Sequence, residues 1–171
     1  MPAPDLARSE DRLREADRGL LRALAARAAW PREPWPPRGG GDPLLAPPLA
    51  ELIYAAAPAG AAPDPAGAAR ANRDLVAALE TLRGCAAARS EARFHQQRPA
   101  SQAALEIGDR ERMAVVLADL AADLRRLDAV RAAAAEVAPL LPDETVGLLW
   151  REHVIPWTHR IGIAHLMDPA P

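Results

Sequence analysis

The chain has 171 residues, of which half are hydrophobic and 4% aromatic, and its formal net charge at pH 7 is −2. This length suits one domain with a substantial core, and the interspersed acids and bases argue against non-specific nucleic-acid binding. A single cysteine excludes an internal disulfide framework, and no apolar run approaches the ~18 residues of a membrane span. Because the N-terminal residues also lack a secretory signal pattern, we expect a soluble cytoplasmic protein.

The composition is that of a helical protein. Alanine, leucine, arginine and glutamate favour helices and are abundant, whereas the β-branched residues that favour strands are few. All 21 basic residues are arginine and none is lysine. Any role that a related protein assigns to lysine must therefore fall to an arginine here.

Apolar residues at helical spacing predict a first helix over residues 6–29. The following residues 31–48 are rich in proline and glycine, which predicts a partly extended loop. A short helix is expected over residues 49–57, before a second connector rich in proline, alanine and glycine. Together these segments predict a single helical domain, 1–171, with a flexible connector at about residues 31–70.

Capping residues indicate where the later helices begin. Asn72 is placed to cap a helix from residue 73 to about residue 97, where an Arg-Pro pair ends it. A short helical turn is expected over residues 101–106. Asp109 is placed to cap a long helix that continues to about residue 137.

The last helix contains a proline in its interior. Asp143 is placed to cap a helix over residues 144–167, and Pro156 lies inside it. Proline removes a backbone hydrogen bond and clashes with the preceding turn, at a cost of roughly 3 kcal/mol, so packing or function must maintain it. We therefore predict an all-α array of about four main helices.

The segment around this proline carries a family pattern. It resembles the last helix of the eukaryotic-type, all-helical chorismate mutases, which reads approximately I-P-[LI]-T-K-x-V-E-V-x-Y-L-L. The matching residues are Ile155, Pro156, Thr158, Ile161, Ile163 and Leu166.

Three further segments agree with this resemblance in order and polarity. Residues 13–27 look like the opening helix of the family. Residues 73–94 are similar to the helix that starts R-D and ends G-K-F-V-A-E-A-K-F, and residues 142–152 are similar to S-P-E-Y-L-V-K-I-Y-K-E. The resemblance implies a type II-like fold, a homodimer, and an isomerase that converts chorismate to prephenate for phenylalanine and tyrosine synthesis.

The resemblance also implies a site, with neither a metal nor a cofactor. Arg93 falls at the lysine that binds the ether oxygen of the substrate, and Arg83 falls near an arginine that binds a carboxylate. Asp119 and Asp123 fall at the Asn (or Asp) and Glu of the third main helix, and Thr158 falls at a threonine that binds a carboxylate. Arg93, Asp123 and Thr158 are thus the expected catalytic residues, and Arg83 and Asp119 are expected to bind substrate.

Two positions depart from the family pattern. Gly162 stands where the family has a glutamate facing the ether oxygen, and Glu10 stands where it has an arginine that enters the site. Preorganised donors typically contribute roughly 3–4 kcal/mol each to transition-state stabilisation. The resemblance therefore supports the predicted fold more strongly than the predicted activity.

Other functions remain compatible with the sequence. The fold could belong to a catalytically impaired relative that binds a small acid or a partner, or to a lyase acting on isochorismate. The similarity could also arise from the alanine, leucine and arginine bias of a generic helical interaction module. Convergence of Arg93, Asp123 and Thr158 on one cavity distinguishes a mutase from the impaired relative, since without it catalysis is excluded. Contact between the first and last helices around Pro156 distinguishes both from the generic module.

Overall fold

A computed structural model describes residues 5–30, 46–57, 64–139 and 141–168, and all regular structure within these ranges is helical. The fold class is therefore all-α, as the composition predicts. The elements, in chain order, are α1 (Leu6–Ala28), α2 (Ala46–Ala56), α3 (Pro65–Gln96), α4 (Arg98–Glu106), α5 (Arg110–Leu117), α6 (Leu120–Val137), α7 (Asp143–Leu149), the π-helical η1 (Trp150–Val154) and α8 (Ile155–Met167).

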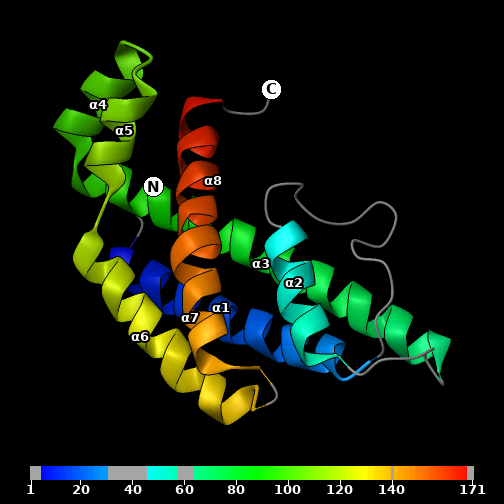
Figure 1. The fold of residues 1–171 in the computed structure, drawn as a ribbon. Coiled ribbons are helices and arrows are strands. Elements are labelled where there is room, and N and C mark those ends of the chain that lie inside the picture. The colour runs from blue at the N-terminus through cyan, green and yellow to red at the C-terminus, as the bar shows by residue number, and fades with distance from the viewer. Residues whose placement is uncertain (1–4, 31–45, 58–63, 140, 169–171) are drawn as a thin grey trace.

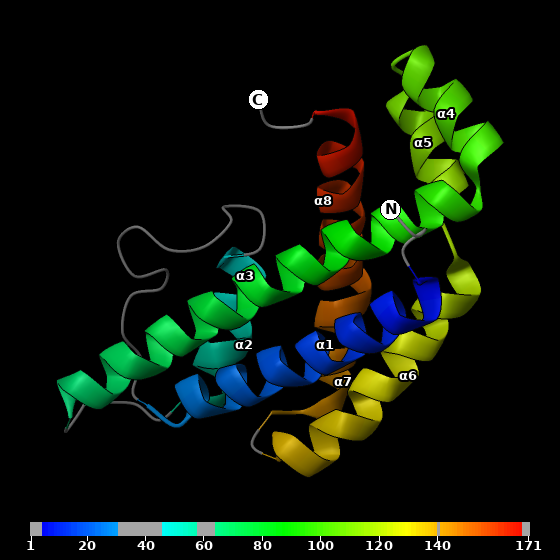
Figure 2. The same ribbon diagram turned by 180° about the vertical axis from the view of Figure 1, so that it is seen from behind.

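The helices form two layers (Figures 1 and 2). Helices α1 and α3 lie side by side in one layer, and α6 and α8 cross them in the other. Helices α4 and α5 form a pair beside the C-terminal half of α8. No described helix combines the length and the hydropathy that crossing a membrane requires.

The main core lies between the two layers. Its largest fully buried side chains are aliphatic residues of α1, α2 and α3 together with one tryptophan: Leu20, Leu21, Leu24, Leu49, Leu52, Ile53, Leu75, Leu82 and Trp150. A separate small cluster of Ala104, Met113 and Leu117 joins the α4–α5 pair to the end of α8. The α4–α5 pair is therefore attached through its own contacts rather than through the main core.

Helix α1 confirms the expected first helix to within one residue. Asp5 caps it by accepting a hydrogen bond from the N–H of Arg8. The proline- and glycine-rich residues that follow, 31–45, lie outside the described residues, as do residues 58–63 of the second connector. Helix α2 begins three residues before the expected residue 49.

The expected start of α3 at residue 73 is wrong. Asp64 caps the helix by accepting from the N–H of Ala66, and Pro65 suits the first turn because its missing N–H has no partner there anyway. Asn72 is buried within the helix, and its Oδ1 accepts from Arg27 Nε at 2.5 Å. Asn72 therefore links α1 to α3 through a side-chain hydrogen bond instead of capping a helix.

The single long helix expected after Asp109 is also wrong, because the chain breaks into α5 and α6. Asp109 does cap α5, by accepting from the N–H of Arg112 at 2.9 Å. Ala118 is then extended (φ −62°, ψ 140°), and Asp119 caps α6 by accepting from the N–H of Ala122 at 2.9 Å. Aspartate competes with the helical backbone in this way, so Asp119 acts as a second helix start inside an apolar run.

The helix around Pro156 is continuous but locally widened. The chain runs from α7 through η1 into α8, and the π turn of Trp150–Val154 directly precedes the proline. Proline cannot donate to a carbonyl of the preceding turn, and π turns are one way in which helices absorb such a defect. Asp143 is the first residue of α7 rather than its cap, which is Pro142.

Candidate functional site

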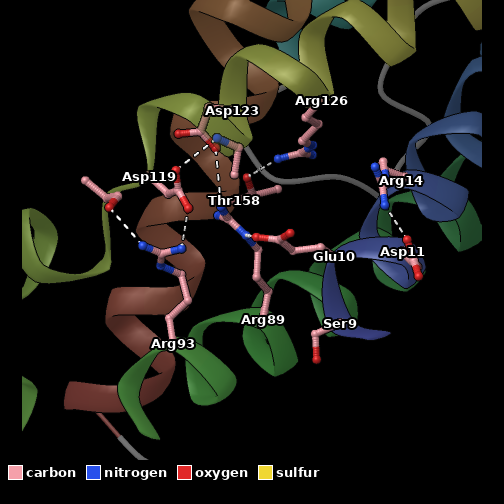
Figure 3. A network of polar contacts seen from close by, with 12 residues as sticks. Ser9, Glu10, Asp11, Arg14, Arg89, Arg93, Asp119, Asp123, Arg126 and Thr158 are labelled. Carbon is pink, nitrogen blue, oxygen red and sulfur yellow. Dashed lines mark hydrogen bonds and ion pairs between the residues drawn. The ribbon is translucent and has the colours of Figure 1, made fainter. Parts of the chain in front are cut away.

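Charged side chains from four helices gather where α1, α3, α6 and α8 approach one another (Figure 3). Three arginines among them are almost fully buried, with exposed fractions of 4% to 7%. We call this group the charged cluster. Its members are Glu10, Asp17, Arg89, Arg93, Asp119, Asp123, Arg126, Thr158 and His159.

Arg93 holds the break between α5 and α6. Its Nη1 donates to Asp119 Oδ2 at 2.6 Å, and its Nη2 donates to the carbonyl of Ala118 at 3.1 Å. Its Nε is buried and has no hydrogen-bond partner within the described residues. The hydrogen bond from Ala122 N–H lowers the pKa of Asp119, and Arg93 adds to this effect against an opposing contribution from burial.

Asp123 lies between a histidine and an arginine. Its carboxylate is 3.1 Å from His159 Nε2 and 3.6 Å from Arg89 Nη2. Burial acts to raise the pKa of Asp123, but His159 and the charges of Arg89 and Arg126 outweigh it, so the pKa lies below its usual range. Asp123 is therefore a carboxylate at neutral pH, which is the state that accepts a hydrogen bond from a hydroxyl.

Arg126 forms the most buried ion pair of the charged cluster. Its Nε and Nη2 donate to the two oxygens of Asp17 at 2.6 and 2.8 Å. Asp17 also accepts from Trp150 Nε1 at 2.8 Å. Arg126 Nη1 donates to the Thr158 hydroxyl at 2.9 Å, and this hydroxyl donates to the carbonyl of Ile155 at 2.8 Å. Thr158 thus has two hydrogen-bond partners within the protein.

A small cavity opens beside the charged cluster. Its lining comes from α1, α3 and α6 and consists of Glu10, Leu13, Arg14, Arg89, Ala122, Arg125 and Arg126. Its volume of about 20 Å³ leaves room for one water molecule rather than for a dicarboxylate. No three His, Cys, Asp or Glu side chains in the described ranges are placed to hold a metal ion.

Four of the five expected site residues lie in the charged cluster: Arg93, Asp119, Asp123 and Thr158. None of the four lines the small cavity. Arg83 does not, because it is exposed and its Nη1 lies 3.7 Å from Glu80. Ten residues turn an α-helix by about 1000°, which leaves Arg83 and Arg93 about 80° apart around the axis of α3.

Arg89, Arg126 and Asp17 were missed in the sequence. Arg89 lies one helical turn before Arg93 on the same face, and Arg126 lies three residues after Asp123. Helical spacing from Arg93 and Asp123 could therefore have identified both arginines as members of the same site. No local signal identified Asp17, because its partners lie 109 and 133 residues away in the chain.

Gly162 lies where α8 packs against Ser90 of α3. A Cβ at this position would overlap Ser90 Oγ and lie 2.8 Å from Ser90 Cβ. The space that the family's glutamate would require is therefore occupied by the Ser90 side chain and the α3 backbone that carries it.

We expect Gly162→Ala to lower the free energy of unfolding by about 1–3 kcal/mol, the usual cost of overpacking. Urea denaturation followed by circular dichroism measures this change. Ser90→Gly should restore most of the loss, because it removes both overlapping atoms. Gly84→Ala is the matched control: its Cβ would meet nothing within 4 Å, so it should not destabilise the protein. An equal effect at both glycines would contradict the crowding seen at Gly162.

The low pKa values of Asp119 and Asp123 predict a sensitivity to acid. The folded state binds protons at these groups less readily than the unfolded chain, whose aspartate pKa is about 3.9. Their contribution to stability is therefore complete above that value and is lost as the pH falls through the folded-state values. In urea titrations, Asp119→Asn and Asp123→Asn should each reduce the decrease in the free energy of unfolding between neutral pH and pH ~3. Asp128→Asn, at an exposed position of α6, should leave it unchanged.

Comparison with known proteins returned no matching family model, no matching curated protein and no matching solved structure.

Proposed function

We propose that the protein is a chorismate mutase of the all-helical type, which binds chorismate at the charged cluster and rearranges it to prephenate. The observation that carries this proposal is the convergence of Arg93, Asp123 and Thr158. They come from three helices and span 65 positions of the chain. Arg93 contacts Asp119, Asp123 contacts Arg89, and Thr158 contacts Arg126. The charges of Arg89 and Arg126 also act on Asp119 and Asp123, respectively, so the three pairs share one electrostatic environment. Cytoplasmic location, a homodimer and a role in phenylalanine and tyrosine synthesis belong to the same proposal.

The chemistry requires binding and electrostatics rather than a nucleophile. The rearrangement of chorismate is pericyclic, so the protein must hold a dianion in a compact conformation and stabilise charge that develops on an ether oxygen. Arg93 supplies a donor, because its buried Nε–H is not used by any described group. Asp123 supplies an acceptor for the ring hydroxyl, and the Thr158 hydroxyl and Arg126 supply donors for a carboxylate.

Substrate entry requires the charged cluster to rearrange. Each buried arginine of the cluster faces a carboxylate of the chain itself, namely Asp119, Asp123 or Asp17. A substrate carboxylate can replace such a partner without leaving the arginine unpaired, so the exchange avoids the large cost of an isolated buried charge.

These internal carboxylates also favour a second candidate, a relative that binds a small acid without turning it over. Ser90 fills the position of the family's glutamate, and Glu10 stands where the family has an arginine. A site with these two changes can still bind a dianion through its arginines, but it has lost two groups that stabilise the transition state.

Incubating the purified protein with chorismate tests both candidates. Loss of chorismate absorbance with matching formation of prephenate is expected for the mutase. Binding of chorismate by calorimetry without turnover would select the binding relative. Neither turnover nor binding, in a protein with a helical circular dichroism spectrum, would overturn both candidates. Formation of salicylate and pyruvate from isochorismate would instead identify the lyase.

A further inference from the structure

We propose that Arg89 anchors one carboxylate of the ligand and that Glu10 occupies this place when no ligand is bound. This inference rests on the proposed function, because it concerns the same charged cluster. It adds a residue that the resemblance does not supply: Arg89 lies four positions before Arg93, where the family pattern has no arginine.

Arg89 has unused hydrogen-bonding capacity in a buried location. Its exposed fraction is 6%, and its contacts with charged groups are the ion pairs to Asp123 at 3.6 Å and to Glu10 at 4.0 Å. Both distances exceed those of a hydrogen bond, and Arg89 donates none within the described residues. A guanidinium carries five N–H donors. No Arg89 nitrogen is among the fully buried atoms that lack a partner, and the side chain lines the small cavity, so its donors can be reached from there. An anion with several acceptor oxygens would satisfy them.

Glu10 is the partner that a ligand can displace. Its side chain is twice as exposed as that of Asp123, at 26% against 13%. Asp123 is also held by His159 at 3.1 Å, whereas Glu10 has the single contact at 4.0 Å with Arg89. Figure 3 shows Arg89 pointing between these two carboxylates, with Glu10 approaching from α1. Glu10 also lines the small cavity, so its departure enlarges the space beside Arg89.

The lining of the cavity indicates the class of ligand. Four arginines, Arg14, Arg89, Arg125 and Arg126, face it together with Glu10 as its one acidic member. Arg14 and Arg126 are paired with Asp11 and Asp17. Arg125 is exposed and forms no ion pair with any described group, so it is available at the rim. The charges match a small dicarboxylate, with one carboxylate on Arg89 and the second near Arg125, once departure of Glu10 has enlarged the cavity.

Glu10→Gln tests the exchange, with Glu15→Gln as the matched control on the same helix. Glu15 pairs with Arg22 on the exposed side of α1 and does not line the cavity. We would measure binding of two probes by calorimetry, chorismate and the non-reacting dicarboxylate malate. If Glu10 occupies Arg89 in about nine of ten molecules, its removal strengthens binding about tenfold. Glu15→Gln should bind both probes as the wild type does, and Arg89→Lys should weaken both.

The outcomes separate this inference from the proposed function. Chorismate turnover by the wild type with no gain in affinity in Glu10→Gln would overturn the role of Glu10 and leave the mutase standing. Tighter malate binding in Glu10→Gln without any turnover of chorismate would support the role of Glu10 and reject the mutase. Weaker binding in Glu10→Gln would show that Glu10 contacts the ligand, which would overturn the inference as well.

Discussion

Replacing Asp17 by alanine is expected to lower the free energy of unfolding by about 3–5 kcal/mol, the range measured when one partner of a buried ion pair is removed. Asp17 is 1% exposed and accepts three hydrogen bonds, two from Arg126 and one from Trp150. Without it, the Arg126 guanidinium stays buried with only Thr158 as a hydrogen-bond acceptor. Urea denaturation at pH 7, followed by circular dichroism, gives the free energy.

The neighbouring Asp11→Ala variant is the control for this prediction. Asp11 pairs with Arg14 at an exposed position of the same helix, and such pairs contribute about 0–1 kcal/mol. Adding Arg126→Met to Asp17→Ala should recover part of the loss, because no unpaired charge remains buried. A cost below about 1 kcal/mol for Asp17→Ala would mean that water reaches Arg126 and that the ion pair is not buried in solution.

Replacing Arg93 by alanine is expected to lower kcat/KM for chorismate by about 10²–10³-fold, the usual effect of losing one preorganised donor to developing charge. Under the proposed function, Arg93 takes the place of the lysine at the ether oxygen. Arg93→Lys keeps the positive charge but loses the second hydrogen bond of the planar fork. We therefore expect Arg93→Lys to retain more activity than Arg93→Ala. Steady-state loss of chorismate absorbance measures both variants.

Arg93 also has a structural role, so a loss of activity requires a control for folding. Arg93 joins α3 to the break between α5 and α6 through Asp119 and Ala118, and its removal loosens this junction. The thermal midpoint and helical signal of Arg93→Ala must therefore be measured alongside activity. Arg73→Ala, an exposed arginine of the same helix, should match the wild type in all three measurements. Full activity in Arg93→Ala would remove it from the catalytic residues.

Local sequence signals were enough to predict the helical class and several helix boundaries. Helix α1, the cap at Asp109 and the proline inside the last helix follow from signals that lie within one or two turns of the chain. Such signals act locally, because capping and apolar spacing depend on residues three or four positions apart. The resemblance grouped Asp119 and Asp123 with Arg93 and Thr158.

Predictions of helix starts from local signals were wrong where a side chain could form either of two sets of contacts. Asn72 has the side chain of a cap but bonds Arg27 of α1, and Asp119 lies in an apolar run but starts a new helix. In both cases a contact from another helix accompanies the outcome, since Arg93 also holds the break beside Asp119. Capping and not capping a helix at these residues differ in free energy by about one hydrogen bond. One contact with a residue far away in the chain is therefore enough to favour either outcome.

Only the tertiary structure decided which charges meet and which space is filled. It put Arg89 in the charged cluster and left Arg83 exposed, although both lie on α3. It also paired Asp17 with Arg126 across 109 positions of the chain, and it made Gly162 a crossing point with α3. Ion pairs and close contacts between helices depend on where the helices cross and how each is rotated about its axis. Packing of the whole core sets both, and no local stretch of sequence contains them.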